Sequence, residues 1–259
     1  HMTSTSTSRE IFLERVRRAL ARGPGTGRRE GCPATCGNRV RAAAIRGDVL
    51  RRTREDRLAL LEILIERARI TGMTVIPCPG VNAATRAVVA LVQQKSRGRD
   101  NSVEAVAWRH PLIDRLVLEP ELSALAPPVR LNRAGLSSRS SLESPRLQSR
   151  QQVAVALFGI TSAEWCVADT ATLVSRTHAG RDRWMSVVPP VNIVVLSIDV
   201  LIADLKELYA LLLCEAEASG PDLTNYMSLI SGPSTTRDIE SIPVTGAHGP
   251  REVHILVVI

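Results

Sequence analysis

Three polar segments in the C-terminal part of the chain carry residue types that could bind or react with a ligand. The first, residues 159–172, contains Glu164 and Asp169, and a carboxylate here could orient a ligand or act as a general base. Both also have structural explanations, because Glu164 fits a capping box begun by Thr161 and Asp169 suits a turn that bonds local amides. The hydroxyl residues of this segment are candidate ligand contacts: Thr161, Thr170 and Thr172.

The second segment, residues 230–240, runs from an apolar strand through Gly-Pro into hydroxyl residues and an expected acidic first turn of a helix. Free backbone amides at a helix start favour an anion, so the segment predicts a small carboxylate or phosphate ligand. Thr235 and Asp238 also fit an ordinary capping box, which is a purely structural explanation. The single glycine and the missing Gly-Lys-Ser/Thr ending argue against a nucleoside triphosphate. The candidate contacts are Ser231, Gly232, Ser234, Thr236 and Asp238.

The third segment, residues 245–250, places His248 between glycines, where an imidazole can approach a ligand without obstruction. We treat His248 as a candidate catalytic residue and Gly249 as a ligand contact, against the alternative of a loop histidine in a tight turn. His178, on a basic loop, is a similar case. No grouping of His, Cys and carboxylates has metal-ligand spacing, so we predict no bound metal.

The elements that would position these segments alternate between strand and helix. A capping box at Thr53–Asp56 opens a helix that ends near Gly72, and Asn82 and Asp199 are candidate caps of later helices. This alternation predicts an α/β fold, a Rossmann-like parallel sheet with helices on both faces. Because such sheets bind ligands at strand ends, we expect the three segments to meet at one edge of a single sheet. The expected strands are residues 73–78, 103–108, 129–131, 153–160, 170–174, 192–198, 227–230 and 253–259.

Two regions follow from the same patterns. Residues 1–52 form a basic N-terminal helix and arm, in which a capping box at Thr7–Glu10 opens a helix and residues 23–50 are a loop. Residues 53–259 form the α/β domain, and the serine- and arginine-rich stretch 132–152 is a surface loop within it.

The net charge of +7 and the pI near 9.8 raise the possibility of a nucleic-acid binder. The first 60 residues hold 14 arginines and six acidic residues but one aromatic residue, Phe12, and no recognisable module, which argues against nucleic acid. No apolar run is long enough to span a membrane, and the start lacks the pattern of a secretory signal. Five scattered cysteines are then reduced thiols, and we expect a cytoplasmic protein.

Four motifs in order carry a family resemblance: Gly-Ile-Thr followed by Ala-Asp-Thr-x-Thr in 159–174, Ser-x-x-Pro at 186–189, Ser-Gly-Pro-Ser-x-Thr-x-Asp-Ile-Glu at 231–240 and Gly-x-His-Gly-Pro at 246–250. Residues 153–259 resemble the LUD domain family of lactate-utilisation proteins (LutC/YkgG type), and the likeness extends weakly upstream. Ala171 stands where the family has glycine. Asn192 stands where it has histidine, which removes acid–base chemistry at that position.

The resemblance implies a fold related to the ribose-phosphate isomerase, glucosamine-phosphate deaminase and CoA-transferase group (NagB/RpiA/CoA-transferase-like). It also implies a role in bacterial oxidation of L-lactate to pyruvate. In that role partner proteins carry the iron–sulfur clusters, and this chain binds no cofactor.

Two other hypotheses remain open from the residues. The chain could be a stand-alone enzyme acting on a phosphorylated sugar or a CoA thioester, with Glu164 or Asp169 as the base and Ser231–Thr236 as the anion site. It could also be a nucleic-acid-binding regulator that uses residues 1–57, in which case DNA binding would be salt-sensitive.

Overall fold

The computed structural model describes residues 33–99, 101–133, 151–176, 181–219, 226–237 and 243–259. The predicted first helix, His178, Asp238 and most of the predicted surface loop lie outside these residues. The chain divides into two compact units, residues 1–41 and 42–259, and the second contains both large sheets. Within the described residues, no helix is both long enough and apolar enough to span a bilayer.

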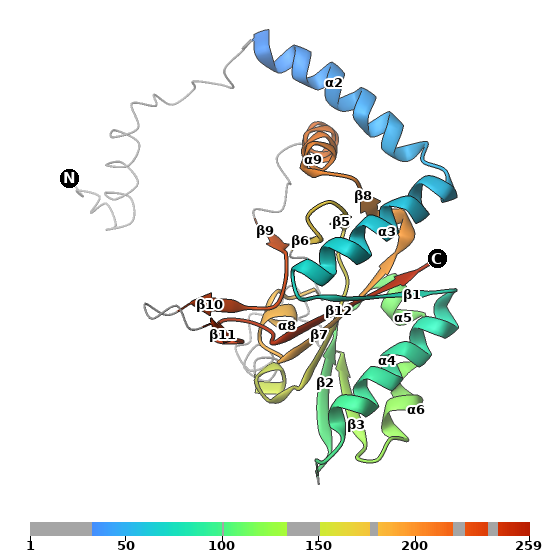
Figure 1. The fold of residues 1–259 in the computed structure, drawn as a ribbon, viewed down its shortest axis with the longest axis vertical. Helices are drawn as coiled ribbons and strands as arrows, with labels where there is room; N and C mark the ends of the chain where they lie inside the picture. The colour runs from blue at the N-terminus through green and yellow to red at the C-terminus, as the bar shows by residue number, and fades with distance from the viewer. Residues whose placement is uncertain (1–32, 100, 134–150, 177–180, 220–225, 238–242) are drawn as a thin grey trace, which may run out of the picture. The chain divides into compact units, whose positions relative to one another are not determined.

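Six parallel strands form the main sheet, in the order β1-β12-β7-β4-β2-β3 (Figure 1). This confirms the predicted parallel sheet. Because all six strands point the same way, their C-terminal ends share one edge, the carboxyl edge, and their N-terminal ends share the opposite amino edge. The strands are β1 (Thr74–Cys78), β2 (Val103–Ala107), β3 (Val129–Arg133), β4 (Phe158–Thr161), β7 (Val191–Ser197) and β12 (Glu252–Val258).

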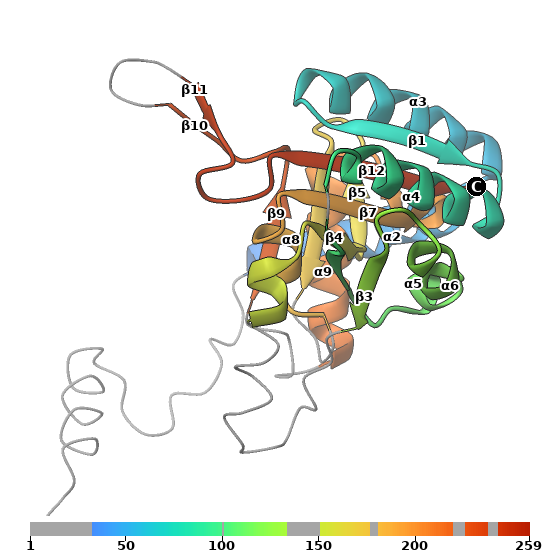
Figure 2. The ribbon, with the colours of Figure 1, turned by 90° about the horizontal axis from the view of Figure 1, so that it is seen from below.

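Both faces of the main sheet are covered, as predicted, because the side chains of its central strands alternate between two apolar clusters. On β12, Leu256 faces one cluster while Ile255 and Val257 face the other. Figure 2 shows helix α3 (Arg54–Ile70) and helix α4 (Val81–Ser96) on opposite sides of β1. The short helices α5 (Pro111–Asp114) and α6 (Leu118–Ser123) contribute to the cluster of α4.

A second, four-stranded sheet packs with α3 on the other face, in the order β8-β5-β6-β9. The prediction of one sheet was therefore wrong for the strands near residues 170–174 and 227–230. The connection between β5 and β6 has only four residues, too few for a parallel crossover, so the two strands pair antiparallel. The strands are β5 (Trp165–Val167), β6 (Thr172–Arg176), β8 (Leu201–Ile202) and β9 (Met227–Ile230).

The structure tests three predicted helix caps. The capping box that opens α3 is confirmed, because Thr53 Oγ1 accepts the Asp56 amide at 3.2 Å and Asp56 accepts the Thr53 amide at 2.9 Å. The cap predicted at Asn82 was wrong, since α4 begins after Gly80 without a side-chain cap. The cap at Asp199 was also wrong, because a short 3-10 turn, η1 (Ile198–Val200), and β8 come before helix α9 (Leu205–Ser219).

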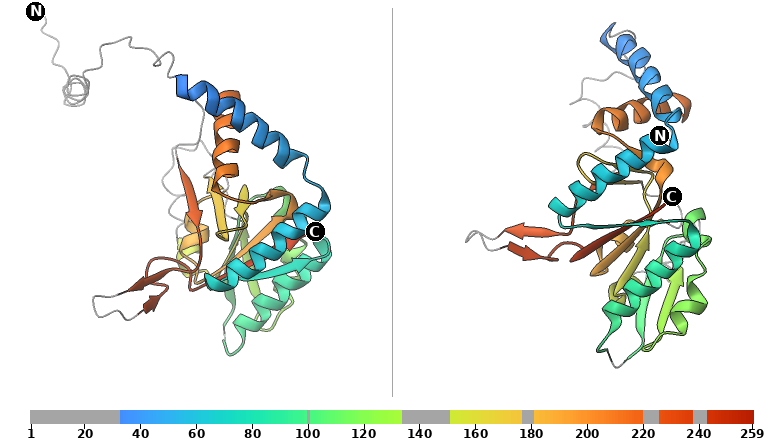
Figure 3. Two further views of the ribbon diagram at one scale, coloured as in Figure 1. Left: turned by 45° about the horizontal axis from the view of Figure 1, so that its top comes forward. Right: turned by 45° about the vertical axis from the view of Figure 1, so that its right-hand side comes forward.

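Other differences concern the ends of predicted loops and strands. Helix α2 (Pro33–Leu50) replaces part of the loop predicted for residues 23–50, in keeping with the helix propensity of its alanine run. Residues 151–155 are helical and precede β4, so the predicted strand 153–160 begins later than expected. A two-stranded hairpin, β10 (Thr235–Arg237) with β11 (Pro243–Thr245), extends beyond the N-terminal end of β12 (Figure 3).

Candidate functional site

A cavity of about 700 Å³ lies at the carboxyl edge, and we call it the carboxyl-edge pocket. Residues from, or directly after, β1, β2, β4, β7 and β12 contribute to its wall, which is where parallel α/β sheets place their ligands. Its volume is in the range of small-molecule sites. Its lining residues include Gly80, His110, Arg115, Glu164, Trp165, Arg176 and Glu215.

His110 follows β2 and caps the first turn of α5. Its Nδ1 accepts the backbone N–H of Leu112 at 3.2 Å, so in the neutral ring the proton lies on Nε2. Burial of the imidazole, together with the charge of Arg181, lowers the pKa of His110 despite the opposing charges of Glu164 and Asp114. The ring is therefore neutral at pH 7 and has an N–H to offer a ligand.

Arg115, at the C-terminal end of α5, supplies a positive charge to the same cavity. Among the residues that the structure describes, its guanidinium makes no ion pair or hydrogen bond. A guanidinium presents a planar set of donors that matches a carboxylate or a phosphate. Arg115 can therefore bind an anion without first breaking a salt bridge.

Glu164 forms part of a paired charge network in the pocket wall rather than the predicted helical cap. Its carboxylate accepts the backbone N–H of Arg176 at 2.9 Å and pairs with Arg181 at 3.3 Å. Arg176 in turn pairs with Glu215 at 2.7 Å and lies 4.9 Å from the ring centre of Trp165. Residues 162–164 form no helical turn, because the chain continues from β4 into β5. Glu164 therefore lines the pocket with each of its two oxygens already accepting a hydrogen bond.

The second and third predicted segments meet each other, but at the amino edge. The backbone N–H of His248 donates to Ser234 Oγ at 3.2 Å, and a Cβ added to Gly249 would lie 3.0 Å from Ser234 Cβ. His248 itself is exposed. Both segments lie on the N-terminal side of β12, across the sheet from the carboxyl-edge pocket.

The helix cap predicted at Thr235 was wrong, and the acidic residues expected in the first turn, 238–240, lie outside the described residues. Thr235–Arg237 form strand β10 and pair antiparallel with β11, so Thr236 is an exposed strand residue. β-Branched threonines favour a strand, and pairing with β11 stabilises the strand over a helix cap.

The first segment joins the second through hydroxyl groups. Thr172 Oγ1 lies 2.7 Å from Ser231 Oγ and donates to Thr170 Oγ1 at 2.8 Å. Gly232 follows, and a Cβ there would come within 2.8 Å of the carbonyl oxygen of Thr71. These contacts tie the second sheet to the end of α3.

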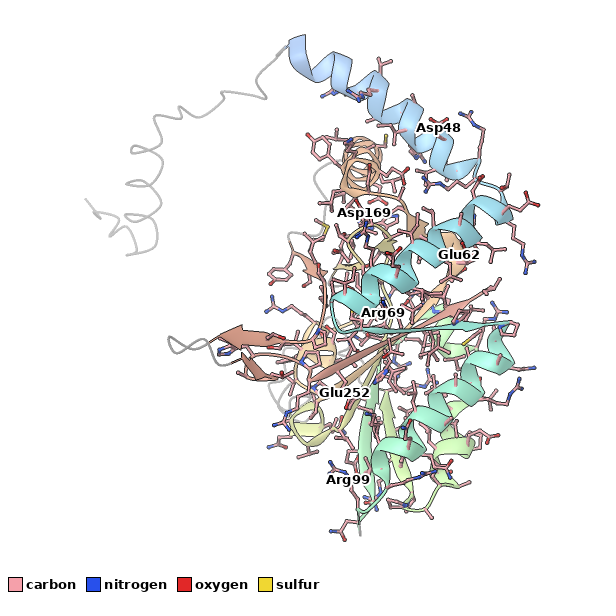
Figure 4. All side chains as sticks on the ribbon, viewed as in Figure 1. Asp48, Glu62, Arg69, Arg99, Asp169 and Glu252 are labelled. Carbon is pink, nitrogen blue, oxygen red and sulfur yellow. The ribbon has the colours of Figure 1, made fainter. Side chains whose placement is uncertain are left out.

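Thr161 and Asp169 were also predicted as site residues. Thr161 is buried and donates to Asn192 Oδ1 at 2.9 Å, which joins the neighbouring strands β4 and β7. Asp169 is exposed in the β5–β6 turn, and Figure 4 shows it well separated from Glu252, where β12 begins. Glu164 and Asp169 lie at opposite ends of the β5–β6 hairpin, so the three predicted segments do not share one pocket.

The residues that sequence reasoning missed are His110, Arg115 and Arg176. One signal was available, since Trp108-Arg109-His110-Pro111 directly follows an apolar strand, and polar residues after a parallel strand lie at its carboxyl end. In the described part of the chain, no three His, Cys, Asp or Glu side chains are placed to hold one metal ion.

Comparisons with known proteins place the chain in a family. The LUD domain model matches residues 61–258. Lactate utilization protein C of Exiguobacterium sp. is 27% identical over 257 residues, which cover 98% of this chain and 97% of that protein. Uncharacterized protein YkgG of Escherichia coli (strain K12) is 28% identical over 137 residues, covering 50% of this chain and 59% of that protein.

A third relative matches over a shorter stretch. Lactate utilization protein B of Bacillus subtilis (strain 168) is 26% identical over 110 residues, which cover 42% of this chain and 21% of that protein. The match to the domain model takes in both sheets described above. The chain therefore belongs to the LUD domain family.

Proposed function

We propose that this chain is a cytoplasmic component of a bacterial lactate-utilisation system and binds a small carboxylate in the carboxyl-edge pocket. The observation that carries the proposal is Arg115, a cation in the pocket wall that has no acidic partner among the described residues. The other arginines near the pocket, Arg176 and Arg181, are already paired with glutamates. Arg115 is thus the cation that a ligand carboxylate would neutralise.

Further support comes from the start of α4. Gly80 and Val81 line the pocket, and the helix begins there without a side-chain cap, so its first backbone amides are open to an acceptor. A Cβ added to Gly80 would meet nothing within 4 Å, which leaves room for a ligand to approach. Both features favour an anion in the same cavity as Arg115.

The relatives supply the substrate class for this proposal. The Exiguobacterium protein, matched over nearly its whole length, is named for lactate utilisation. Lactate and its oxidation product, pyruvate, are both small monocarboxylates. Oxidation of lactate to pyruvate releases two electrons and two protons, so an electron acceptor is needed. We propose that iron–sulfur partner proteins supply that acceptor and that this chain binds no redox cofactor.

The Bacillus subtilis relative, named Lactate utilization protein B, indicates what a partner could look like. It matches this chain over 21% of its own length, so the larger protein contains one region similar to part of this chain. A partner of that kind would bring both a related domain and additional sequence to the assembly. Co-expression and co-purification with such a protein, followed by a test for lactate-dependent reduction of the assembly, would examine this part of the proposal.

Binding to the isolated chain tests the pocket. We would titrate the protein with L-lactate, pyruvate, inorganic phosphate and CoA, and measure affinity by calorimetry. Arg115→Gln should weaken binding of the carboxylates about tenfold or more, because a charge-assisted hydrogen-bond pair is lost. Arg99→Gln is the matched control, since Arg99 is exposed and precedes β2 at the opposite edge of the sheet (Figure 4).

Two results would contradict the proposal. Carboxylate affinity that is the same in Arg115→Gln and in the unmodified protein would remove Arg115 from the site. Binding of phosphate or CoA without lactate or pyruvate would instead favour an enzyme that acts on a phosphorylated sugar or a thioester.

A further inference from the structure

The hydrogen bond at Nδ1 of His110 determines what the ring can offer to a ligand. Leu112 N–H donates to Nδ1 at 3.2 Å, and an N–H donor requires a lone pair at that nitrogen. The remaining ring proton of neutral His110 must then lie on Nε2. Within the described residues Nε2 has no hydrogen-bond partner, and the ring lines the carboxyl-edge pocket.

The charges around the ring come from several elements. Burial and Arg181 lower the pKa of His110, whereas Glu164, from the β4–β5 connection, and Asp114, from α5, act in the opposite direction. Glu164 is itself paired with Arg181, which reduces its influence on the ring. Near pH 7 the ring is therefore a neutral donor at Nε2, not an imidazolium and not a base at that nitrogen.

The backbone positions of His110 and Arg115 are also fixed relative to each other. His110 is the N-cap and Arg115 the C-cap of α5, a single helical turn. The turn is held by the Asp114 amide, which donates to the His110 carbonyl at 2.8 Å, and its Ile113 side chain is fully buried. One helical turn thus holds the backbone of both residues, and a neutral N–H donor and a guanidinium line one cavity.

We infer that the carboxyl-edge pocket selects 2-oxo acids over 2-hydroxy acids, with the ligand carboxylate on Arg115 and the keto oxygen accepting the N–H of His110. The inference rests on the proposed carboxylate site and deepens it by naming the preferred substrate class. It places pyruvate, rather than lactate, as the ligand that this pocket holds.

The preference follows from matching donors with acceptors. A keto oxygen only accepts hydrogen bonds. It can therefore accept the N–H at Nε2, and it has no donor that would stay without a partner. A hydroxyl group also carries a proton that needs an acceptor. The carboxylates that line the pocket, Glu164 and Glu215, are each already paired with an arginine. A 2-hydroxy acid would therefore have to share a carboxylate with one of these arginines, whereas a 2-oxo acid needs no acceptor in the pocket.

Two variants of His110 test the roles of its two ring nitrogens separately. His110→Asn keeps an acceptor for the Leu112 amide, because asparagine is a favoured N-cap, but it has no group at the Nε2 position. His110→Gln extends an amide N–H toward that position. We expect pyruvate to bind the unmodified protein about tenfold more tightly than L-lactate. His110→Asn should remove most of that difference by weakening pyruvate alone, and His110→Gln should restore part of it.

Histidine ¹⁵N NMR of the unmodified chain gives a readout that does not depend on affinity. The ring of His110 should show a protonated Nε2 and an unprotonated Nδ1 from pH 7 to 8, and His110→Asn identifies its resonances by their loss. An Nδ1-protonated ring or an imidazolium at pH 7 would overturn the inference. So would equal affinity for the two acids, or equal weakening of both by His110→Asn, although either result would leave carboxylate binding at Arg115 intact. If neither acid binds, the proposed function fails, and this inference fails with it.

Discussion

The carboxylate of Glu164 accepts the backbone N–H of Arg176 at 2.9 Å and thereby bridges the end of the β5–β6 hairpin that faces the carboxyl-edge pocket. Its second oxygen pairs with Arg181 at 3.3 Å. One side chain thus joins the connection after β4, the end of β6 and the segment that leads into helix α8 (Trp184–Val187). The pocket wall depends on this carboxylate for its shape.

Glu164→Ala should lower the free energy of unfolding by about 2 kcal/mol, because a half-buried guanidinium and a backbone amide both lose a charged acceptor. Urea denaturation measures the change, and the slope with denaturant should stay constant. Glu62→Ala, on the exposed face of α3 (Figure 4), is the control and should change stability by less than about 0.5 kcal/mol. Equal effects of the two substitutions would show that Glu164 has no structural role.

Gly159→Ala should destabilise the fold strongly. A Cβ on Gly159 of strand β4 would lie 2.0 Å from the backbone carbonyl oxygen of Met185 in α8, and backbone atoms move only if the layers separate. We expect a loss of about 3 kcal/mol, or failure to fold, measured by thermal and urea denaturation. Gly47→Ala in α2 is the matched change, since its Cβ would meet only Arg51 side-chain atoms at 3.5 Å and alanine favours a helix. A fully stable Gly159→Ala protein would contradict the close approach of β4 and α8.

Thr172 and Ser231 should be energetically coupled, because their hydroxyl oxygens lie 2.7 Å apart between β6 and the end of β9. In a double-mutant cycle, Thr172→Val and Ser231→Ala should show an interaction of about 0.5–1 kcal/mol in unfolding free energy. Thr172→Val combined with Thr236→Val, on the exposed β10 strand, should be additive. Additivity in the first pair would mean that the two hydroxyl groups do not interact in solution.

Stability at acidic pH should depend on Glu252, at the start of β12. Burial disfavours its charge, but hydrogen bonds from Lys95 and His254 outweigh this and hold the pKa of Glu252 below its ordinary value of 4.5. Because the folded-state pKa is lower than the unfolded one, the carboxylate stabilises the fold above pH 4.5. That stabilisation is lost as the pH falls through the folded-state pKa.

Unfolding free energies of the unmodified protein and Glu252→Gln, measured from pH 7 to 3, test this linkage. The difference between the two proteins should be constant above about pH 5 and should shrink below pH 4.5. Glu62→Gln should show no such convergence, because Glu62 is exposed and has no partner among the described residues. A difference that stays constant down to pH 3 would argue against the pairing of Glu252.

Local chemistry explains which elements could be predicted from the sequence. The start of α3 was predictable because Thr53 and Asp56 satisfy each other's backbone amides within one turn. The continuous apolar runs of β7 and β12 were predictable because both faces of a central parallel strand are buried. These signals lie within a few residues of one another in the chain, so no distant partner is needed to interpret them.

The tertiary structure decided everything that depends on a distant partner. Thr235 and Asp238 have the spacing of a capping box, yet Thr235–Arg237 form a strand because Pro243–Thr245 pair with them. Likewise, Glu164 fits a local cap in the sequence, but the fold brings Arg176 and Arg181 to its carboxylate.

The residues of the carboxyl-edge pocket likewise could not be brought together from the sequence alone. His110 and Arg115 lie on a single helical turn, which is too short to show a helical periodicity in the sequence. The rest of their cavity is lined by residues that follow other strands, among them β4, which lies beside β2 in the sheet. The sequence alone determined a parallel α/β domain with polar strand ends. Which strand ends lie next to one another was decided by the order and pairing of the strands. The hydrogen bonds that determine this order join residues far apart in the chain, so the sequence pattern does not show it.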